Sequence, residues 1–130
     1  MSKNVTFRAF RATDIEFVNK HENGARIEFE NKYSYNVKYS TNNICIGELM
    51  VDVNDKGDKD KFHIHAVIQG MFSFNPEVKR ELLHVQTFKE LFPYARTMIS
   101  SLTVNAGIPP VIIPNFDIES QSIYKFGKNV

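Results

Sequence analysis

Two histidines are the residues with the clearest potential for metal chemistry. His63 and His65 stand two positions apart in a segment of alternating apolar and polar residues, so a strand would place both imidazoles on one face. Neighbouring imidazoles can chelate zinc, but a stable site needs further ligands, and no Cys or other His follows at ligand spacing. We therefore expect exposed strand histidines and no bound metal.

The stretch 54–61, with the sequence NDKGDKDK, holds aspartates that suggest calcium as an alternative ion. A calcium-binding loop also needs a bidentate glutamate at its distal end, and this stretch has none. The intervening lysines are typical of a solvated turn. We therefore interpret the stretch as a polar hairpin tip, and we expect the chain to need no cofactor.

Other signatures of catalysis are missing from the sequence. It has no glycine-rich phosphate loop, no paired cysteines and no G-x-S-x-G elbow, and no nucleophile stands beside a plausible base. The single cysteine, Cys45, lies between Ile44 and Ile46, which favours a packed thiol over a reactive one. We expect a protein that is not an enzyme, with a site assembled from scattered residues as the alternative.

Length and charge limit the kinds of partner. One domain spanning residues 1–130 is the natural organisation for a chain of this length. The net charge of +1 predicts no bulk attraction to nucleic acid or membrane. Lysine and arginine in residues 26–38 alternate on one face with Glu28 and Glu30, which weakens any footprint for nucleic acid. We therefore expect no nucleic-acid partner.

The sequence carries no recognisable signal for export or membrane insertion. No window approaches the roughly 20 apolar residues of a membrane span, and no signal peptide opens the sequence. The single cysteine rules out an internal disulfide, which favours a reducing compartment. The expectation is a cytoplasmic protein that does not insert into membranes.

Four segments have the period-two pattern of half-buried strands. They are residues 5–18, 25–39, 44–53 and 62–74. In the first segment the apolar parity changes near Arg11 to Asp14, which predicts a bulge or bend there. In the third segment the parity changes at Gly47, where a second bulge is expected.

One long helix is expected after the fourth strand, from Asn75 to about Gly107, because apolar residues recur there at steps of three and four. Pro76 suits a first-turn position, and Asn75 is a plausible N-cap. Pro93 is the anomaly, since a proline inside a helix deletes a hydrogen bond and costs about 3 kcal/mol. The sequence therefore predicts a break or kink at Pro93.

Strands first and a helix afterwards predict an α+β fold with a four-stranded antiparallel meander sheet. An apolar, proline-rich linker at residues 108–117 and a short C-terminal segment complete the expected chain. The 11 Phe and 5 Tyr suit either a core or an adhesive surface, and periodicity does not choose between them. One helix hides too little apolar surface, so we expect a homo-oligomer.

The helix and the segments around it carry a family resemblance. Residues 91–101, LFPYARTMISS, followed by GIP at 107–109 and PNFD at 114–117, resemble the signature of the SecB protein-export chaperones. The fourth strand ends with QGMFSF at 69–74, which is similar to the family's Q-G-x-F-S-like strand end. Residues 11–17, RATDIEF, resemble the family's first strand. The matches stand in the family's order along the chain.

The resemblance implies a SecB-like fold and a homotetramer, built as a dimer of dimers with the long helices sandwiched between the sheets. It also implies a cytoplasmic chaperone that binds unfolded or non-native polypeptides, with preproteins for Sec export as expected clients, and keeps them translocation-competent. Such a holdase needs apolar grooves for an extended client. The candidate client-binding residues are Phe72, Phe74, Phe92, Val111, Ile113 and Phe116. Each of them could instead fill the core or a subunit interface.

Chaperones of this family deliver clients to the SecA motor through acidic residues on the first strand and an extended C-terminal tail. Asp14 matches the first acidic position and Glu16 stands nearby, so both are candidate SecA-binding residues. However, Val18 stands where a second acid would be expected, and the short tail is basic. We therefore expect weak SecA binding. The alternatives are a SecB-like chaperone dedicated to an antitoxin of a toxin–antitoxin system, or an oligomeric interaction scaffold for one folded partner.

Overall fold

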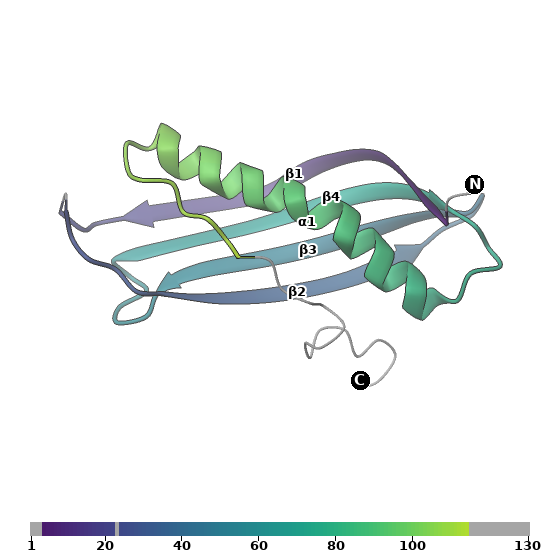
Figure 1. The fold of residues 1–130 in the computed structure, drawn as a ribbon, viewed down its shortest axis with the longest axis horizontal. Coiled ribbons are helices and arrows are strands. Elements are labelled where there is room, and N and C mark those ends of the chain that lie inside the picture. Colours follow the sequence, from purple (N-terminus) through teal and green to yellow (C-terminus); the bar gives the residue numbers. More distant parts are fainter. Residues whose placement is uncertain (1–3, 23, 115–130) are drawn as a thin grey trace.

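The structure is a computed structural model that describes residues 4–22 and 24–114. Its elements follow in the order β1 (Val5–Asn19), β2 (Phe29–Tyr39), β3 (Ile44–Asp55), β4 (Phe62–Phe74) and α1 (Arg80–Asn105). The strands form one twisted antiparallel sheet, and α1 lies across one of its faces (Figure 1). This confirms the predicted α+β fold. The expected C-terminal segment lies outside the described residues.

The strand order in the sheet is β1-β4-β3-β2. The predicted meander therefore holds from β2 to β4, but β1 pairs antiparallel with β4 instead of β2. The alternation of apolar and polar residues shows which residues of a strand face the core. It does not show which strand lies beside it. As a result, the chain must cross the end of the sheet to reach β2, and we call the described residues of this connection, 20–22 and 24–28, the crossover segment (Figure 1).

β1 has two register shifts against β4, one between Phe7 and Ala9 and one between Ala12 and Asp14. The second confirms the fault predicted near Arg11 to Asp14. Each extra residue turns the following side chain to the other face. Phe10 consequently joins Phe7 on the face of α1, where the ring centroids of both lie within 5.0 Å of that of Tyr94.

β3 is regular, so the predicted bulge at Gly47 is wrong. Its pairing with both neighbours runs without a shift, and Cys45, Gly47 and Leu49 are all buried on the face of α1. Gly47 is needed for space, because a Cβ atom there would overlap the hydroxyl of Tyr35. That hydroxyl donates a hydrogen bond to Thr87 Oγ1 at 2.6 Å and so joins β2 to α1.

β2 is shorter than predicted, since it begins at Phe29 and not at residue 25. Phe29 pairs with Asp55, the last residue of β3, so the preceding residues have no strand partner. One more hydrogen bond extends the contact, from the Lys56 backbone N–H to the Glu28 carbonyl at 2.8 Å. The alternation of apolar and polar residues before Phe29 therefore belongs to the crossover segment and not to a strand.

α1 begins at Arg80, five residues later than predicted, and its N-cap is Lys79. Asn75 instead forms a turn, because its side-chain oxygen accepts a hydrogen bond from the Glu77 backbone N–H at 3.0 Å. The helix ends as predicted just before Gly107, which has a φ of 86° that a residue without a Cβ adopts most easily.

The break predicted at Pro93 is absent, and α1 is helical on both sides of it. Pro93 lies on the exposed side of the helix. Carbonyl groups on that side can tilt towards water, which accommodates the proline ring and the missing N–H group.

The core lies between the inner sheet face and α1. Its largest fully buried side chains are Phe62, Phe72, Phe88, Leu49, Ile64, Ile68, Leu83, Leu91, Ile99, Ile113 and His84. Residues 106–114, here called the linker, fold back from α1 over the sheet (Figure 1). Several hydrogen bonds hold the linker to α1. Arg96 Nε donates to the Ile113 carbonyl at 2.7 Å, the Val111 N–H donates to Thr103 Oγ1 at 2.9 Å, and the Ile108 N–H donates to the Thr103 carbonyl at 3.2 Å.

Candidate functional site

A cavity of about 410 Å³ opens at the end of the sheet where the crossover segment meets the linker, and we call it the crossover cavity. Its walls come from three parts of the chain that lie far apart in the sequence. The lining residues are Asn19, His21, Glu22, Gly24, Ala25, Ile27, Phe29, Phe62, Gly107, Ile108, Pro109, Pro110 and Val111.

The interior wall of the crossover cavity is apolar. Phe62 is fully buried at its base, and the Phe29 ring packs against it with centroids 5.1 Å apart while staying 38% exposed. Ile27, Ile108 and Val111 are half-buried and pack against the same core. Their free surface is directed into the cavity, so this wall can bury an apolar group of a ligand.

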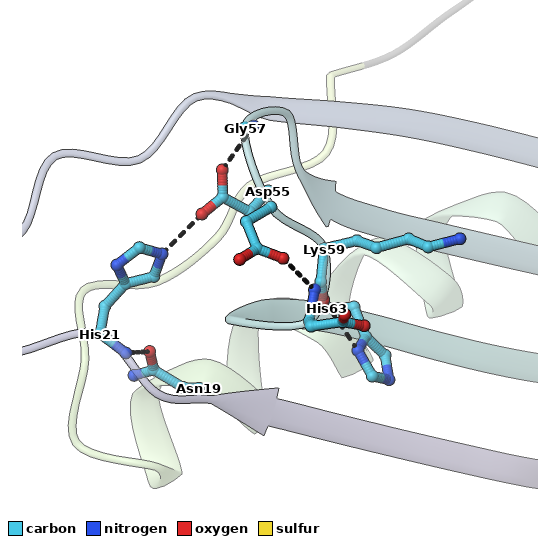
Figure 2. Close-up of polar contacts among 8 residues, drawn as sticks. Asn19, His21, Asp55, Gly57, Lys59 and His63 are labelled. Carbon is cyan, nitrogen blue, oxygen red and sulfur yellow. Dashed lines mark hydrogen bonds and ion pairs between the residues drawn. The ribbon is translucent and has the colours of Figure 1, made fainter.

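The rim of the cavity is polar, and one side-chain pair holds it. His21 Nε2 lies 2.6 Å from Asp55 Oδ2, and Asp55 Oδ1 accepts a hydrogen bond from the Gly57 N–H at 2.8 Å (Figure 2). The hydrogen bond with His21 is the main reason why the pKa of Asp55 lies below its usual value. Asp55 is therefore a carboxylate at neutral pH that fixes the imidazole against the hairpin tip.

Three of the predicted client-binding residues belong to the core. Phe72, Phe92 and Ile113 are 0%, 4% and 0% exposed, respectively, and all three join one apolar cluster. A client could reach them only if the helix or the linker moved. In this structure these three side chains therefore fill the core, which was the alternative to client binding.

The other predicted client-binding residues lie in different places. Val111 lines the crossover cavity. Phe74 is half-buried at the opposite end of β4, where its ring meets that of Tyr39 edge-on with centroids 5.5 Å apart. Phe116 lies outside the described residues. The structure therefore does not bring the predicted set together into one groove.

Sequence reasoning missed Ile27, Phe29, Phe62 and Ile108 as cavity residues. Ile27 and Phe29 were assigned to the core face of a strand, because the alternation continues through them. One signal in the sequence could have indicated an apolar wall here. Gly107 can stop the helix, and Ile108 and two prolines follow it directly. The partner wall depends on the crossover, which the pattern does not reveal.

The predicted SecA-binding residues lie on the other face of the sheet, away from α1. Glu16 pairs with His65 across the β1–β4 ladder, and Asp14 pairs with Val67. The side chains of Asp14 and Glu16 are 52% and 61% exposed. Both acids are therefore accessible to a partner on this outer face.

Histidines accompany these acids on the outer face. His65 lies between two carboxylates, with Nδ1 2.6 Å from Asp52 Oδ1 and Nε2 3.5 Å from Asp14 Oδ2. The hydrogen bond with Asp52 is the main reason why the pKa of His65 is raised. His63 Nε2 lies 3.6 Å from Glu16 Oε1. The negative charge of the acids is thus offset when the histidines are protonated.

The described residues give no support for a metal site or a membrane span. They contain no group of three or more His, Cys, Asp or Glu side chains that could hold a metal ion. His63 Nδ1 instead lies 3.2 Å from the Lys59 carbonyl (Figure 2).

Burial raises the pKa of Cys45 to about 11, so its thiol stays protonated. Within the described residues, no helix has the length and apolar character needed to cross a membrane.

Comparison with protein families gives a match along most of the chain. Residues 3–126 match the family model described as preprotein translocase subunit SecB. An uncharacterised protein of Methanocaldococcus jannaschii is 27% identical over 121 residues, which cover 86% of this chain and 78% of that protein.

Several relatives carry the name protein-export protein SecB, and two of them show the extent of the match. That of Orientia tsutsugamushi (strain Boryong) is 33% identical over 95 residues, 69% of this chain and 59% of the relative. That of Rhizobium etli is 38% identical over 64 residues, 47% of this chain and 40% of the relative. The matched part thus spans roughly half the length of these SecB proteins.

A solved structure shares the fold. It is the SecB-like chaperone of Mycobacterium tuberculosis in complex with a ChAD peptide from the HigA1 antitoxin. The TM-score is 0.71 at 13% identity, with 87% of this chain and 91% of that chain covered. With the family match over residues 3–126, the chain belongs to the SecB family.

Proposed function

We propose that the protein is a chaperone that binds unfolded or non-native polypeptides in the cytoplasm, without enzymatic activity or a cofactor. Preproteins destined for Sec export are the first candidate clients, because relatives of the family are protein-export proteins. The observation that carries the proposal is the crossover cavity, whose apolar wall is open to a ligand.

The cavity supports a binding mode in which an extended client inserts one apolar side chain at a time. Phe29, Ile108 and Val111 supply non-directional contacts, which accept side chains of many shapes. Burying one large apolar side chain contributes about 1.5–3 kcal/mol, which is roughly tenfold or more in affinity. Several such contacts along a client would retain it without recognition of a particular sequence.

Suppression of aggregation tests this proposal. The protein should protect several unrelated unfolded proteins, and Ile108→Asp should weaken the protection because it places a charge in the cavity wall. Ile112→Asp is the matched control: it lies in the same linker, is 66% exposed and does not line the cavity. Equal loss in both variants, at unchanged melting temperature, would contradict the proposed site.

Contact with the SecA motor is a separate proposal based on Asp14 and Glu16. Both are exposed on the outer face, so their contribution would be electrostatic and sensitive to salt. Because Val18 stands where a second acid would be expected, we expect weak binding. Asp14→Lys should abolish SecA binding in a titration at low salt and leave aggregation suppression unchanged. Tight binding that is insensitive to salt would place the contact elsewhere.

An antitoxin is the alternative client. The structural relative from Mycobacterium tuberculosis was solved with an antitoxin peptide, which supports this second function. A chaperone dedicated to one antitoxin would bind a single segment tightly and would not protect unrelated unfolded proteins. A scaffold for one folded partner would also fail the aggregation assay, but it would bind that partner in its native state.

We also propose a homotetramer, built as a dimer of dimers. Large apolar side chains of β1 and α1 remain exposed in the single chain, including Phe10 at 45%, Ile15 at 46%, Tyr94 at 43% and Val104 at 50%. Covering them with further copies would remove this surface from water. Light scattering should therefore report an oligomer, and a monomer of 15.0 kDa at micromolar concentration would refute the assembly.

A further inference from the structure

Backbone hydrogen bonds attach the described part of the crossover segment to the hairpin tip at its two ends. At the start, the Lys20 N–H donates to the Lys61 carbonyl at 2.7 Å. At the end, the Glu28 carbonyl accepts from the Lys56 N–H at 2.8 Å. The residues between these points include Ala25 and Ile27, which line the crossover cavity. Ile27 also packs against the core, so the part of the segment whose position needs a further contact is the stretch just after Lys20.

A side-chain contact ties the start of the crossover segment to the hairpin tip, and it is the His21–Asp55 pair (Figure 2). The two side chains are only 19% and 11% exposed, so water competes weakly for their hydrogen bond. Both partners are themselves held: the His21 N–H donates to Asn19 Oδ1 at 3.1 Å, and Asp55 accepts from Gly57. The pair is therefore a defined contact between two fixed groups.

Other charged residues stand near the pair in the sequence of the two segments that it joins. Lys20 and Glu22 flank His21 in the crossover segment, and Lys56, Asp58 and Lys61 belong to the hairpin tip. The part of the linker that lines the cavity, residues 107–111, has no titratable side chain. The carboxylate of Asp55 is thus the acid that contacts the His21 imidazole.

We propose that His21 and Asp55 are positioning residues for the crossover cavity, because their contact keeps the crossover segment in place as the cavity's outer wall. This inference rests on the proposed client binding at that cavity. Without the contact, the segment would sample other positions, and a client would have to order it on binding. The pair would then set affinity for clients through the position of the segment, in addition to any contact that His21 makes as a lining residue.

Variants of His21 test this role. His21→Ala removes the contact and should weaken binding of a labelled, extended peptide rich in Phe and Leu about fivefold to tenfold. His21→Gln retains a side-chain amide that can donate to Asp55, so it should recover most of the affinity. His63→Ala is the matched control, since His63 is a half-buried histidine at the same end of the sheet and does not line the cavity.

Hydrogen exchange reports on the wall itself. In His21→Ala, the amides of the crossover segment should exchange faster, while those of α1 should keep their rate. Combining His21→Ala with Asp55→Ala should cost no more affinity than Asp55→Ala alone, because the two residues act through one contact. Additive losses of affinity would overturn the proposal.

The failure of this inference can be told apart from the failure of the proposed function. If Ile108→Asp weakens peptide binding and His21→Ala does not, the cavity binds clients and the positioning role is wrong. If neither variant changes peptide binding, clients bind elsewhere, and both the cavity and its positioning pair lose their proposed roles.

Discussion

Replacement of Gly47 by alanine should destabilise the protein through Tyr35. A Cβ atom at position 47 would overlap the Tyr35 hydroxyl and approach ring atom Cζ to 2.9 Å. Tyr35 is only 5% exposed, and its hydroxyl donates to Thr87, so it cannot move without losing a buried contact. Overpacking of a core costs typically about 1–3 kcal/mol, and the lost hydrogen bond adds about 1 kcal/mol.

The magnitude for Gly47→Ala is therefore about 2–4 kcal/mol of unfolding free energy. Tyr35→Phe alone should cost only about 0.5–1.5 kcal/mol, since Thr87 Oγ1 also donates to the Leu83 carbonyl at 2.8 Å. In the double variant the overlap with the hydroxyl no longer exists, so the two costs should not add.

Urea denaturation at a fixed protein concentration measures these three variants against the unmodified protein. We expect the double variant to be at least about 1 kcal/mol more stable than the sum of the single losses predicts. Additive losses, or a harmless Gly47→Ala, would show that Tyr35 does not determine the glycine at position 47.

Three further predictions concern single side chains. The raised pKa of His65 means that its contact with Asp52 stabilises the fold fully below the unfolded pKa of about 6.5 and fades as pH rises through the folded value. His65→Gln should thus lower the free energy of unfolding in urea more at pH 5.5 than at pH 8.5, by less than about 1 kcal/mol because the pair is partly exposed; an equal effect at both pH values would contradict this. Cys45, whose pKa burial raises to about 11, should resist iodoacetamide at pH 8 until urea unfolds the chain, and rapid labelling of the native protein would refute its burial. Pro93→Ala should stabilise the protein by about 1–3 kcal/mol, because the exposed position then gains a helical N–H; a loss of stability in urea would show that Pro93 has a packing role.

The sequence predicts the elements of this fold better than their arrangement. Alternation identified four strands, and the parity change near Arg11 to Asp14 identified a real register shift, because the side chains that follow must return to the core face. The same rule failed at Gly47. Cys45 and Gly47 face the core there, and Ile44 and Ile46 lie on the outer face. Apolar character alone would place the two isoleucines on the core face, which is why the bulge prediction was wrong.

Tertiary context explains the remaining differences. Asn75 has a good residue type for a helix cap, yet its side chain caps a turn before Lys79 and Arg80 start the helix. The crossover cavity could not be predicted, since its walls meet only because β1 pairs with β4. Of the predicted client-binding residues that the structure describes, Val111 alone lines it, because large aromatic residues such as Phe72 and Phe92 are buried in the core.

The pairing of β1 with β4 has a consequence for the order of folding. Val5 pairs with Phe74 and Asn19 with Phe62, so every contact of this ladder closes a long loop. Contacts between β2, β3 and β4 are local, and loop-closure entropy favours their formation first. During synthesis β1 is made first, but its partner is the last strand to be made. Until then Phe7, Phe10 and Phe17 are held on an unpaired strand, which makes the nascent chain resemble the kind of polypeptide that the finished protein is proposed to bind.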